Sequence, residues 1–256
     1  MPADWSLLTK ELGLWSKAGR TPRVWLRDDD AVAPSASLDR LLALCERYEV
    51  PLVLAVIPEP TGEALARHLR NAALASVAVH GWRHANYAPA SEKKQELGRH
   101  RPAAEVVAEL TRGLSKLSAL HGEKVLPMLV PPWNRMDASL VPAIPGAGFR
   151  AVSTFADTLT EDQTGDLKVI NAHLDIIDWS TRRGGEHARL ATQFVDELRK
   201  SRQTGGYPVG ILTHHIVHDD QAWDFLDQLL EMTALSGPCE WQSGPALLET
   251  PRPAKA

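Results

Sequence analysis

Short apolar segments alternate with amphipathic segments along this chain, and the alternation limits its possible folds more than any other feature. The apolar segments are rich in Val, Leu and Ile, and most lack the alternating polar residues of a half-exposed strand. Near-continuous hydrophobicity is typical of strands buried on both faces of a parallel sheet. The predicted strands are residues 23–27, 52–57, 76–80, 126–130, 149–153, 169–174 and 209–213.

The amphipathic segments between these strands have the spacing of helices. Leu38, Leu41 and Cys45 recur at helical intervals, and Ser35 or Ser37 precedes them as an N-cap. The predicted helices are residues 38–48, 61–71, 102–120, 138–144, 186–201 and 221–235. Strands separated by helices form βα units with right-handed crossovers. About seven such units favour an open or distorted barrel, and a flat doubly wound sheet is the alternative.

The composition excludes several classes of protein. Hydrophobic residues make up 44% and charged residues 23% of the 256 residues, as in an ordinary globular enzyme. A formal net charge of −4 without a basic cluster argues against a nucleic-acid partner. Residues 1–20 lack the apolar core of a signal peptide, and no apolar run reaches the length of a membrane span. We expect a cytoplasmic protein without membrane contact, forming one domain over residues 1–256 with a disordered tail at 251–256.

Three consecutive aspartates, Asp28, Asp29 and Asp30, follow the first predicted strand. In parallel α/β folds, functional groups gather at the carboxyl ends of strands. Adjacent carboxylates repel one another, and burying them is costly unless a cation compensates their charge. The run therefore indicates a cation site, although a solvated turn before a helix would use the same residues.

Two histidines, His80 and His84, follow the third predicted strand. Separated by three residues, they can face one point, and imidazole suits zinc, cobalt, nickel or iron. Alone, such a pair is more often two unrelated polar histidines than a pair of ligands. With one carboxylate from the aspartate run, it forms a two-histidine, one-carboxylate ligand set that leaves coordination positions open for water.

Three more clusters follow predicted strands. The loop after residue 130 contains two prolines and Trp133, whose flat ring can stack on a sugar. Residues 173–179 contain Asp175 and Asp178. Residues 210–215 end in His214 and His215, and aspartates follow at 219 and 220. A neighbouring aspartate can orient a histidine and prepare it as a general acid.

In this order, the five clusters resemble the motifs of the polysaccharide deacetylase (chitooligosaccharide deacetylase homology) superfamily. The matching segments are 28–30, 80–84, 131–133, 175–179 and 212–214. They extend over most of the chain. The resemblance implies an α/β fold, specifically a deformed (β/α) barrel with about seven parallel strands.

The resemblance also implies a metal set and a catalytic base. One aspartate of the run is the base and the next is a metal ligand. The spacing to the following helix and strand favours Asp29 as base and Asp30 as ligand, with Asp28 and Asp29 as the alternative register. His80 and His84 complete the ligand set around one divalent ion. Zinc is the expected ion, and cobalt, nickel, manganese and iron are alternatives.

The remaining motifs imply a general acid and substrate contacts. His214 matches the family's general acid, with His215 as the nearest substitute, and Asp175 belongs to the catalytic group. The expected substrate-binding residues are Trp82, Pro132, Trp133 and Trp179. These tryptophans are also compatible with ordinary packing in a barrel.

The chain departs from the family pattern at two positions. Val130 occupies the place of an arginine that pairs with the catalytic base, and Arg27 and Arg135 are candidates to supply that charge. Ala31 occupies the place of a glycine after the aspartate pair. The loss of the arginine concerns polysaccharide specificity more than metal binding.

Together, the residues and the resemblance predict a metal-dependent hydrolase of C–N amide bonds that removes an N-acetyl group from a sugar or a related small molecule. The loss of the arginine at Val130 leaves open a hydrolase of a small non-sugar amide or imide. A non-catalytic carbohydrate- or metabolite-binding relative with a vestigial metal site is the other alternative. The expected partner is a carbohydrate or another small molecule.

Overall fold

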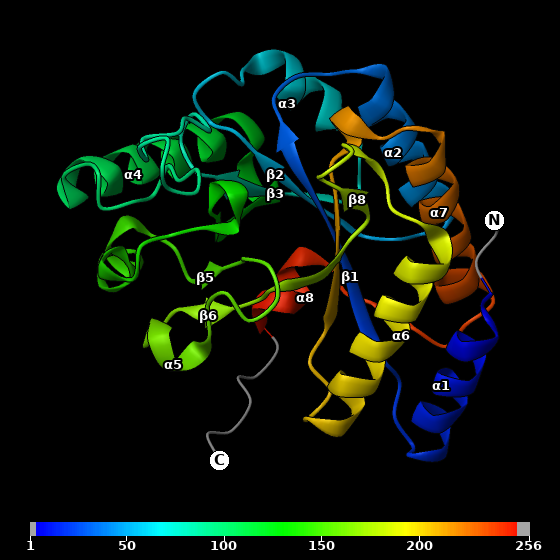
Figure 1. Cartoon of the computed structure of the whole chain (residues 1–256). Helices are drawn as coiled ribbons and strands as arrows, with labels where there is room; N and C mark the ends of the chain where they lie inside the picture. Colours follow the sequence, from blue (N-terminus) through cyan, green and yellow to red (C-terminus); the bar gives the residue numbers. More distant parts are fainter. Residues whose placement is uncertain (1–3, 250–256) are drawn as a thin grey trace.

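A curled parallel sheet surrounded by helices forms the framework of the protein (Figure 1). The structure, a computed structural model, describes residues 4–249. The strands follow the order β6-β5-β4-β3-β2-β1-β10-β7, with β11 beside β1, and all of these pairs are parallel. Their bounds are β1 Arg23–Ala31, β2 Leu52–Val56, β3 Ala75–His80, β4 Val125–Val130, β5 Ala151–Val152, β6 Lys168–Val169, β7 Ala172–Asp175, β10 Val209–Thr213 and β11 Glu240–Trp241. A separate antiparallel hairpin joins β8 (Ile177–Asp178) to β9 (Arg183–Gly184).

The helices largely follow the predicted segments. Their bounds are α1 Ser6–Lys17, α2 Ala36–Arg47, α3 Glu63–Leu69, α4 Ala103–His121, α5 Glu161–Thr164, α6 His187–Gln203, α7 Asp220–Leu230 and α8 Gly244–Glu249. Ser35 caps α2 by accepting from the backbone N–H of Leu38. The helix predicted at 138–144 is instead a 3₁₀ segment that contains Pro142, which cannot donate to a helical hydrogen bond. Helix α1 was not predicted.

The prediction of one strand at residues 169–174 is wrong. The segment consists of two strands, β6 and β7, at opposite ends of the sheet order, with only Ile170 and Asn171 between them. The side chain of Asn171 accepts from the backbone N–H of Thr154 and donates to the carbonyl of Ala156, which interrupts a regular strand.

Because the two ends of the sheet are consecutive in the chain, the sheet curls back toward itself. The predicted deformed (β/α) barrel is confirmed, with eight strands along its path rather than about seven, and the flat-sheet alternative is excluded. No helix within residues 4–249 is long and apolar enough to cross a membrane. The tail predicted to be disordered, residues 251–256, lies outside the described part of the chain.

Alternate residues of β1 point to two different environments. Val24 and Leu26 belong to the large core between the sheet and the helices. Trp25 belongs to a second, smaller core inside the barrel, which Leu247 of α8 helps to fill. With a period of two, Arg27 and Asp29 point to the same side as Trp25. The barrel interior is therefore apolar at one end and ionic where β1 ends.

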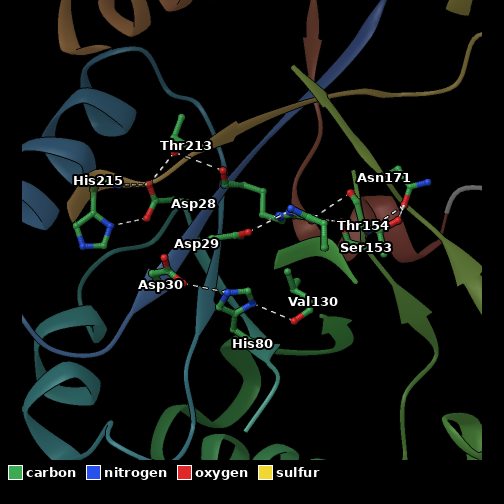
Figure 2. A network of polar contacts seen from close by, with 12 residues as sticks. Asp28, Asp29, Asp30, His80, Val130, Ser153, Thr154, Asn171, Thr213 and His215 are labelled. Carbon is green, nitrogen blue, oxygen red and sulfur yellow. Dashed lines mark hydrogen bonds and ion pairs between the residues drawn. The ribbon is translucent and has the colours of Figure 1, made fainter. Parts of the chain in front are cut away.

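Asp28, on the other face of β1, links this strand to β10. Its carboxylate accepts from the hydroxyl of Thr213 at 2.7 Å and from the backbone N–H of His215 at 2.8 Å, and it also bonds Nδ1 of His215 (Figure 2). Both Asp28 and His215 are buried. Burial disfavours the ionised carboxylate, but the hydrogen bonds and charge of His215 outweigh it and lower the pKa of Asp28. Burial likewise disfavours the imidazolium, yet Asp28 raises the pKa of His215.

We predict that Asp28→Asn lowers the free energy of unfolding by about 3 kcal/mol. The donors of Thr213 and His215 bond two carboxylate oxygens in the wild type, but an amide offers them only one acceptor oxygen. The loss should be fully present near pH 6. It should shrink as the pH rises through the raised pKa of His215, where the ion pair of the wild type also disappears. Urea unfolding at several pH values measures both effects.

Asp39→Asn is the matched control, since Asp39 bonds His68 at 2.8 Å on the surface. We expect it to change stability by less than about 0.5 kcal/mol. Equal effects of the two substitutions would contradict a special role for the buried pair.

Candidate metal centre and active-site cleft

A β-bulge at the end of β1 turns two consecutive aspartates toward the same cleft. Asp28 pairs with Leu54 and Ala31 with Val56, so β1 has one more residue than β2 over this interval. Asp30 adopts a left-handed backbone conformation with φ of 70°, which aspartate tolerates better than most residues. Without the bulge, Asp29 and Asp30 would point to opposite faces of the sheet. Instead, both line the cleft.

His80 ends β3, and a tight turn brings His84 back beside it. Nδ1 of His80 donates to the carbonyl of Val130 at 2.9 Å, and Nε2 is directed at Asp30, so Nε2 is the nitrogen that could ligate an ion (Figure 2). The rings of His80 and His84 lie 5.1 Å apart between centroids. Gly81 permits the turn, because it has a positive φ and a Cβ there would lie 2.3 Å from the carboxylate of Glu96.

The three side chains predicted as metal ligands lie together. Oδ1 of Asp30 is 3.1 Å from Nε2 of His80 and 3.3 Å from Nε2 of His84, and one ligand atom from each residue lies within 4.8 Å of the others. A tetrahedral zinc ion with bonds near 2.0–2.1 Å would hold its ligand atoms about 3.3 Å apart. The donor set, its spacing and the ring orientation of His80 all fit a divalent ion.

The charges of these groups support one another. Burial opposes ionisation of Asp30, but the hydrogen bond from His80 and the charges of both histidines lower its pKa. Burial opposes protonation of His80, but Asp30 and Asp29 raise its pKa. For His84, burial and then the charge of His80 lower the pKa. An ionised Asp30 and a neutral His84 have the form that metal ligation requires, whereas a protonated His80 would release its proton on binding an ion.

Glu96, which the sequence analysis missed, holds the histidine turn in place. It is fully buried, and its carboxylate accepts from the backbone N–H groups of Trp82 at 3.3 Å, Arg83 at 2.9 Å and His84 at 3.1 Å. Burial raises the pKa of Glu96, against the opposing effect of these three donors. It lies in the polar segment 91–101, where no pattern distinguishes it from its charged neighbours.

A buried arginine pairs with the predicted base. Nε and Nη2 of Arg27 donate to the two oxygens of Asp29 at 2.9 and 3.0 Å. Arg27 is fully buried and Asp29 is 2% exposed. Arg135 donates instead to the carbonyl of Lys94 on the surface. Of the two arginines considered for the place left by Val130, Arg27 is the one that contacts Asp29.

The alternative assignments do not meet this geometry. Asp28 and His215 bond each other on the opposite face of β1, so neither faces the cluster of Asp30 and the two histidines. His214, by contrast, lines the cleft. Asp29 and Asp30 therefore lie together at the cleft, as the favoured register requires. His215 lies apart from both.

Asp175 contacts the predicted acid only indirectly. It accepts from Nε1 of Trp179 at 2.7 Å and from the backbone N–H of Ile177 at 2.9 Å. The rings of Trp179 and His214 in turn make a T-shaped contact, at 4.6 Å between centroids. Within residues 4–249, Nδ1 of His214 has no hydrogen-bond partner. The link from Asp175 to His214 therefore runs through Trp179.

An open cleft of about 1240 Å³ contains the metal cluster. Trp133 and Trp179, both predicted to bind substrate, line it, and Trp133 packs against His84 at 4.3 Å between ring centroids. Trp82 does not line it, because its ring packs under the guanidinium of Arg112. Pro132 is buried behind Gly81 rather than exposed to substrate.

Comparisons with known proteins find the same fold in solved structures of low sequence identity. No protein-family model and no curated protein matches the sequence. A Mycobacterium smegmatis structure assigned to the polysaccharide deacetylases aligns with a TM-score of 0.63 and 16% identity, over 92% of this chain and 94% of that one. A family 4 acetyl xylan esterase from Clostridium thermocellum, in complex with a cobalt ion, aligns with a TM-score of 0.54 and 16% identity, over 88% and 89%.

A CE4 family pseudoenzyme from Bacillus anthracis also shares the fold. It aligns with a TM-score of 0.54 and 15% identity, over 86% of this chain and 63% of that one. Active enzymes and pseudoenzymes therefore have the same architecture. Whether this chain catalyses a reaction must be argued from its own residues.

We predict that Glu96→Gln weakens zinc binding roughly 10- to 100-fold, because an amide NH₂ group would face backbone N–H donors and release His84. Competition with a chromophoric chelator measures the affinity. Glu92→Gln is the control, since Glu92 lies in the same segment but pairs only with Arg99 and His100. Equal zinc affinity in both variants would show that Glu96 does not support the centre.

Proposed function

Because the chain has the fold of the polysaccharide deacetylases, we propose that it is a metal-dependent hydrolase that removes an N-acetyl group from an acetylated sugar or a related small molecule. The observation that carries the proposal is a three-residue metal set next to a buried aspartate–arginine pair in one cleft. A non-catalytic protein would have no need to keep a costly buried ion pair beside such a set.

Asp30, His80 and His84 would hold one divalent ion, with zinc as the first candidate. In such a position, an ion lowers the pKa of water and polarises a carbonyl group. The protein's own part is to keep the three ligands in place. The carbonyl of Val130 keeps Nε2 of His80 free for the ion, and Glu96 keeps the turn that presents His84.

Asp29 is the proposed general base, which takes a proton from the attacking water. Both of its oxygens accept hydrogen bonds from Arg27, so the carboxylate is already held in one orientation before substrate binds. The side chains of Asn134 and Ser153 also accept hydrogen bonds from the guanidinium, which keeps it from rotating away from Asp29. Preorganisation of this kind is what general-base catalysis requires of its geometry.

His214 is the proposed general acid, which gives a proton to the leaving nitrogen. Its ring makes a T-shaped contact with that of Trp179, and the bond from Trp179 to Asp175 fixes that contact. Asp175 is therefore a positioning residue that acts through Trp179. Burial raises the pKa of Asp175, against the opposing charge of His214.

Two other functions remain to be separated from this one. Hydrolysis of a small non-sugar amide or imide was suggested by the missing arginine at Val130, but Arg27 now contacts the base in its place. A cleft of about 1240 Å³ also exceeds what a small metabolite needs. A non-catalytic relative would bind sugar without releasing acetate.

The proposed function predicts that purified protein loaded with zinc releases acetate from N-acetylated sugars but does not open cyclic ureides or imides. Exhaustive chelation should abolish the release, and added zinc or cobalt should restore it. Acetate is measured with a coupled enzyme assay. Full activity after chelation would rule out the mechanism, and sugar binding with no acetate release would favour the non-catalytic alternative.

For the base, we predict that Asp29→Asn lowers kcat by roughly 10²- to 10⁴-fold, because the amide cannot accept the proton of water. Zinc stoichiometry should stay at one ion per chain, since Asp29 is not in the ligand set. Asp30→Asn should instead lower zinc affinity. An Asp29→Asn protein that is folded, loaded with zinc and undiminished in turnover would disprove the assignment of the base.

A further inference from the structure

The ladder between β7 and β10 contains a β-bulge at His173. Gly210 pairs with Ala172 and Ile211 pairs with Leu174, so His173 has no counterpart on β10. Bulges are common next to active sites, where they redirect a side chain from the strand's regular alternation. The imidazole of His173 lines the cleft that contains the metal cluster. No step of the proposed mechanism uses it.

A hydrogen bond at this bulge determines the tautomer of the imidazole. The backbone N–H of Gly210 donates to Nδ1 of His173 at 3.0 Å, so the ring accepts a bond that a strand carbonyl accepts in a regular ladder. A ring nitrogen that accepts carries no proton, and in a neutral imidazole the proton is then on Nε2. Burial lowers the pKa of His173 to about 4, so the ring is neutral at neutral pH.

The orientation of the ring is fixed from two sides. Gly210 bonds Nδ1, and the ring of Tyr207 packs against the imidazole at 5.1 Å between centroids. The hydroxyl of Tyr207 donates to Glu197 of α6, which holds that ring in turn. Among residues 4–249, none accepts a hydrogen bond from Nε2 of His173, and the side chain is only partly buried. A ligand in the cleft is the acceptor that the geometry leaves for this donor.

We propose that His173 is a specificity-determining residue, whose Nε2–H donates to an uncharged oxygen on the sugar unit next to the one that is deacetylated. This inference rests on the proposed function. The cleft, at about 1240 Å³, is larger than the roughly 300–1,000 Å³ of pockets that bind one drug-sized ligand. It therefore has room for a unit beyond the reacting one.

The ring of His173 is an uncharged donor. Burial and the positive charges of Lys200 and Arg27 lower its pKa, against the opposing charge of Asp157. A neutral N–H donor suits a hydroxyl or an amide carbonyl, which are the acceptors of a neutral acetylated sugar. The proposed preference is thus for an extended neutral glycan over a single sugar.

Two substitutions separate a substrate contact from a structural role. In His173→Asn, the side-chain oxygen occupies the place of Nδ1 and keeps the bond to Gly210, but the donor at Nε2 is lost. In His173→Gln, the longer amide reaches the place of Nε2 and keeps a donor there, but the bond to Gly210 is lost. The measurement is kcat/KM of zinc-loaded protein for N-acetylglucosamine and for its β-1,4-linked trimer.

The wild type should prefer the trimer, and His173→Asn should lower the ratio of trimer to monomer roughly tenfold, mainly through KM for the trimer. His173→Gln should keep most of the ratio while losing thermal stability. A ratio that survives in the Asn variant, or that falls only in the Gln variant, would overturn the inference. If the wild type releases no acetate from either sugar, the proposed function itself fails. An active wild type with an unaltered ratio in both variants removes only the role of His173.

Discussion

The buried guanidinium of Arg27 is the group on which the arrangement of the proposed active site depends. It donates to both oxygens of Asp29, to the hydroxyl of Ser153, to the carbonyl of Thr154 and to the side chain of Asn134. These partners come from β1 and from the loops that follow β4 and β5. A fully buried charge is tolerated only when its donors find acceptors of good geometry. Because the buried guanidinium needs all of these acceptors, its hydrogen bonds hold the three segments in fixed positions around the proposed base.

The position of Arg27 shows that a charge can reach the same place in a site from a different position in the sequence. In the family that the motifs resemble, the arginine comes just before the proline of the third motif, where this chain has Val130, the last residue of β4. Here the Val130 side chain packs in the apolar core of the barrel, while its carbonyl still orients His80. Arg27 approaches Asp29 along their own strand, two residues before it and on the same face. The charge is preserved, although the residue that supplies it is not.

Much of this structure could be read from the sequence, and the parts that could not have one cause in common. The apolar segments and the order of the five motifs predicted the parallel barrel, and they predicted which of its loops meet. By contrast, Glu96 looks like any residue of a polar segment until the turn at Gly81 closes around it. The division of residues 168–175 into β6 and β7 depends on Asn171 bonding distant backbone groups. Features that depend on a tertiary partner leave no local pattern.

Backbone irregularity is the means by which this regular barrel presents its functional groups. One bulge sends Asp29 and Asp30 to the same cleft, and another redirects His173. Four non-glycine residues around the cluster, namely Asp30, His84, Trp133 and Asn134, have positive φ angles. Such conformations cost on the order of 1–3 kcal/mol each and persist only where neighbouring groups enforce them. Glu96 enforces the conformation of His84 through its backbone N–H, and Arg27 enforces that of Asn134 through its side chain. The polar groups that sequence reasoning found hardest to assign are thus the ones that hold the strained backbone of the site in place.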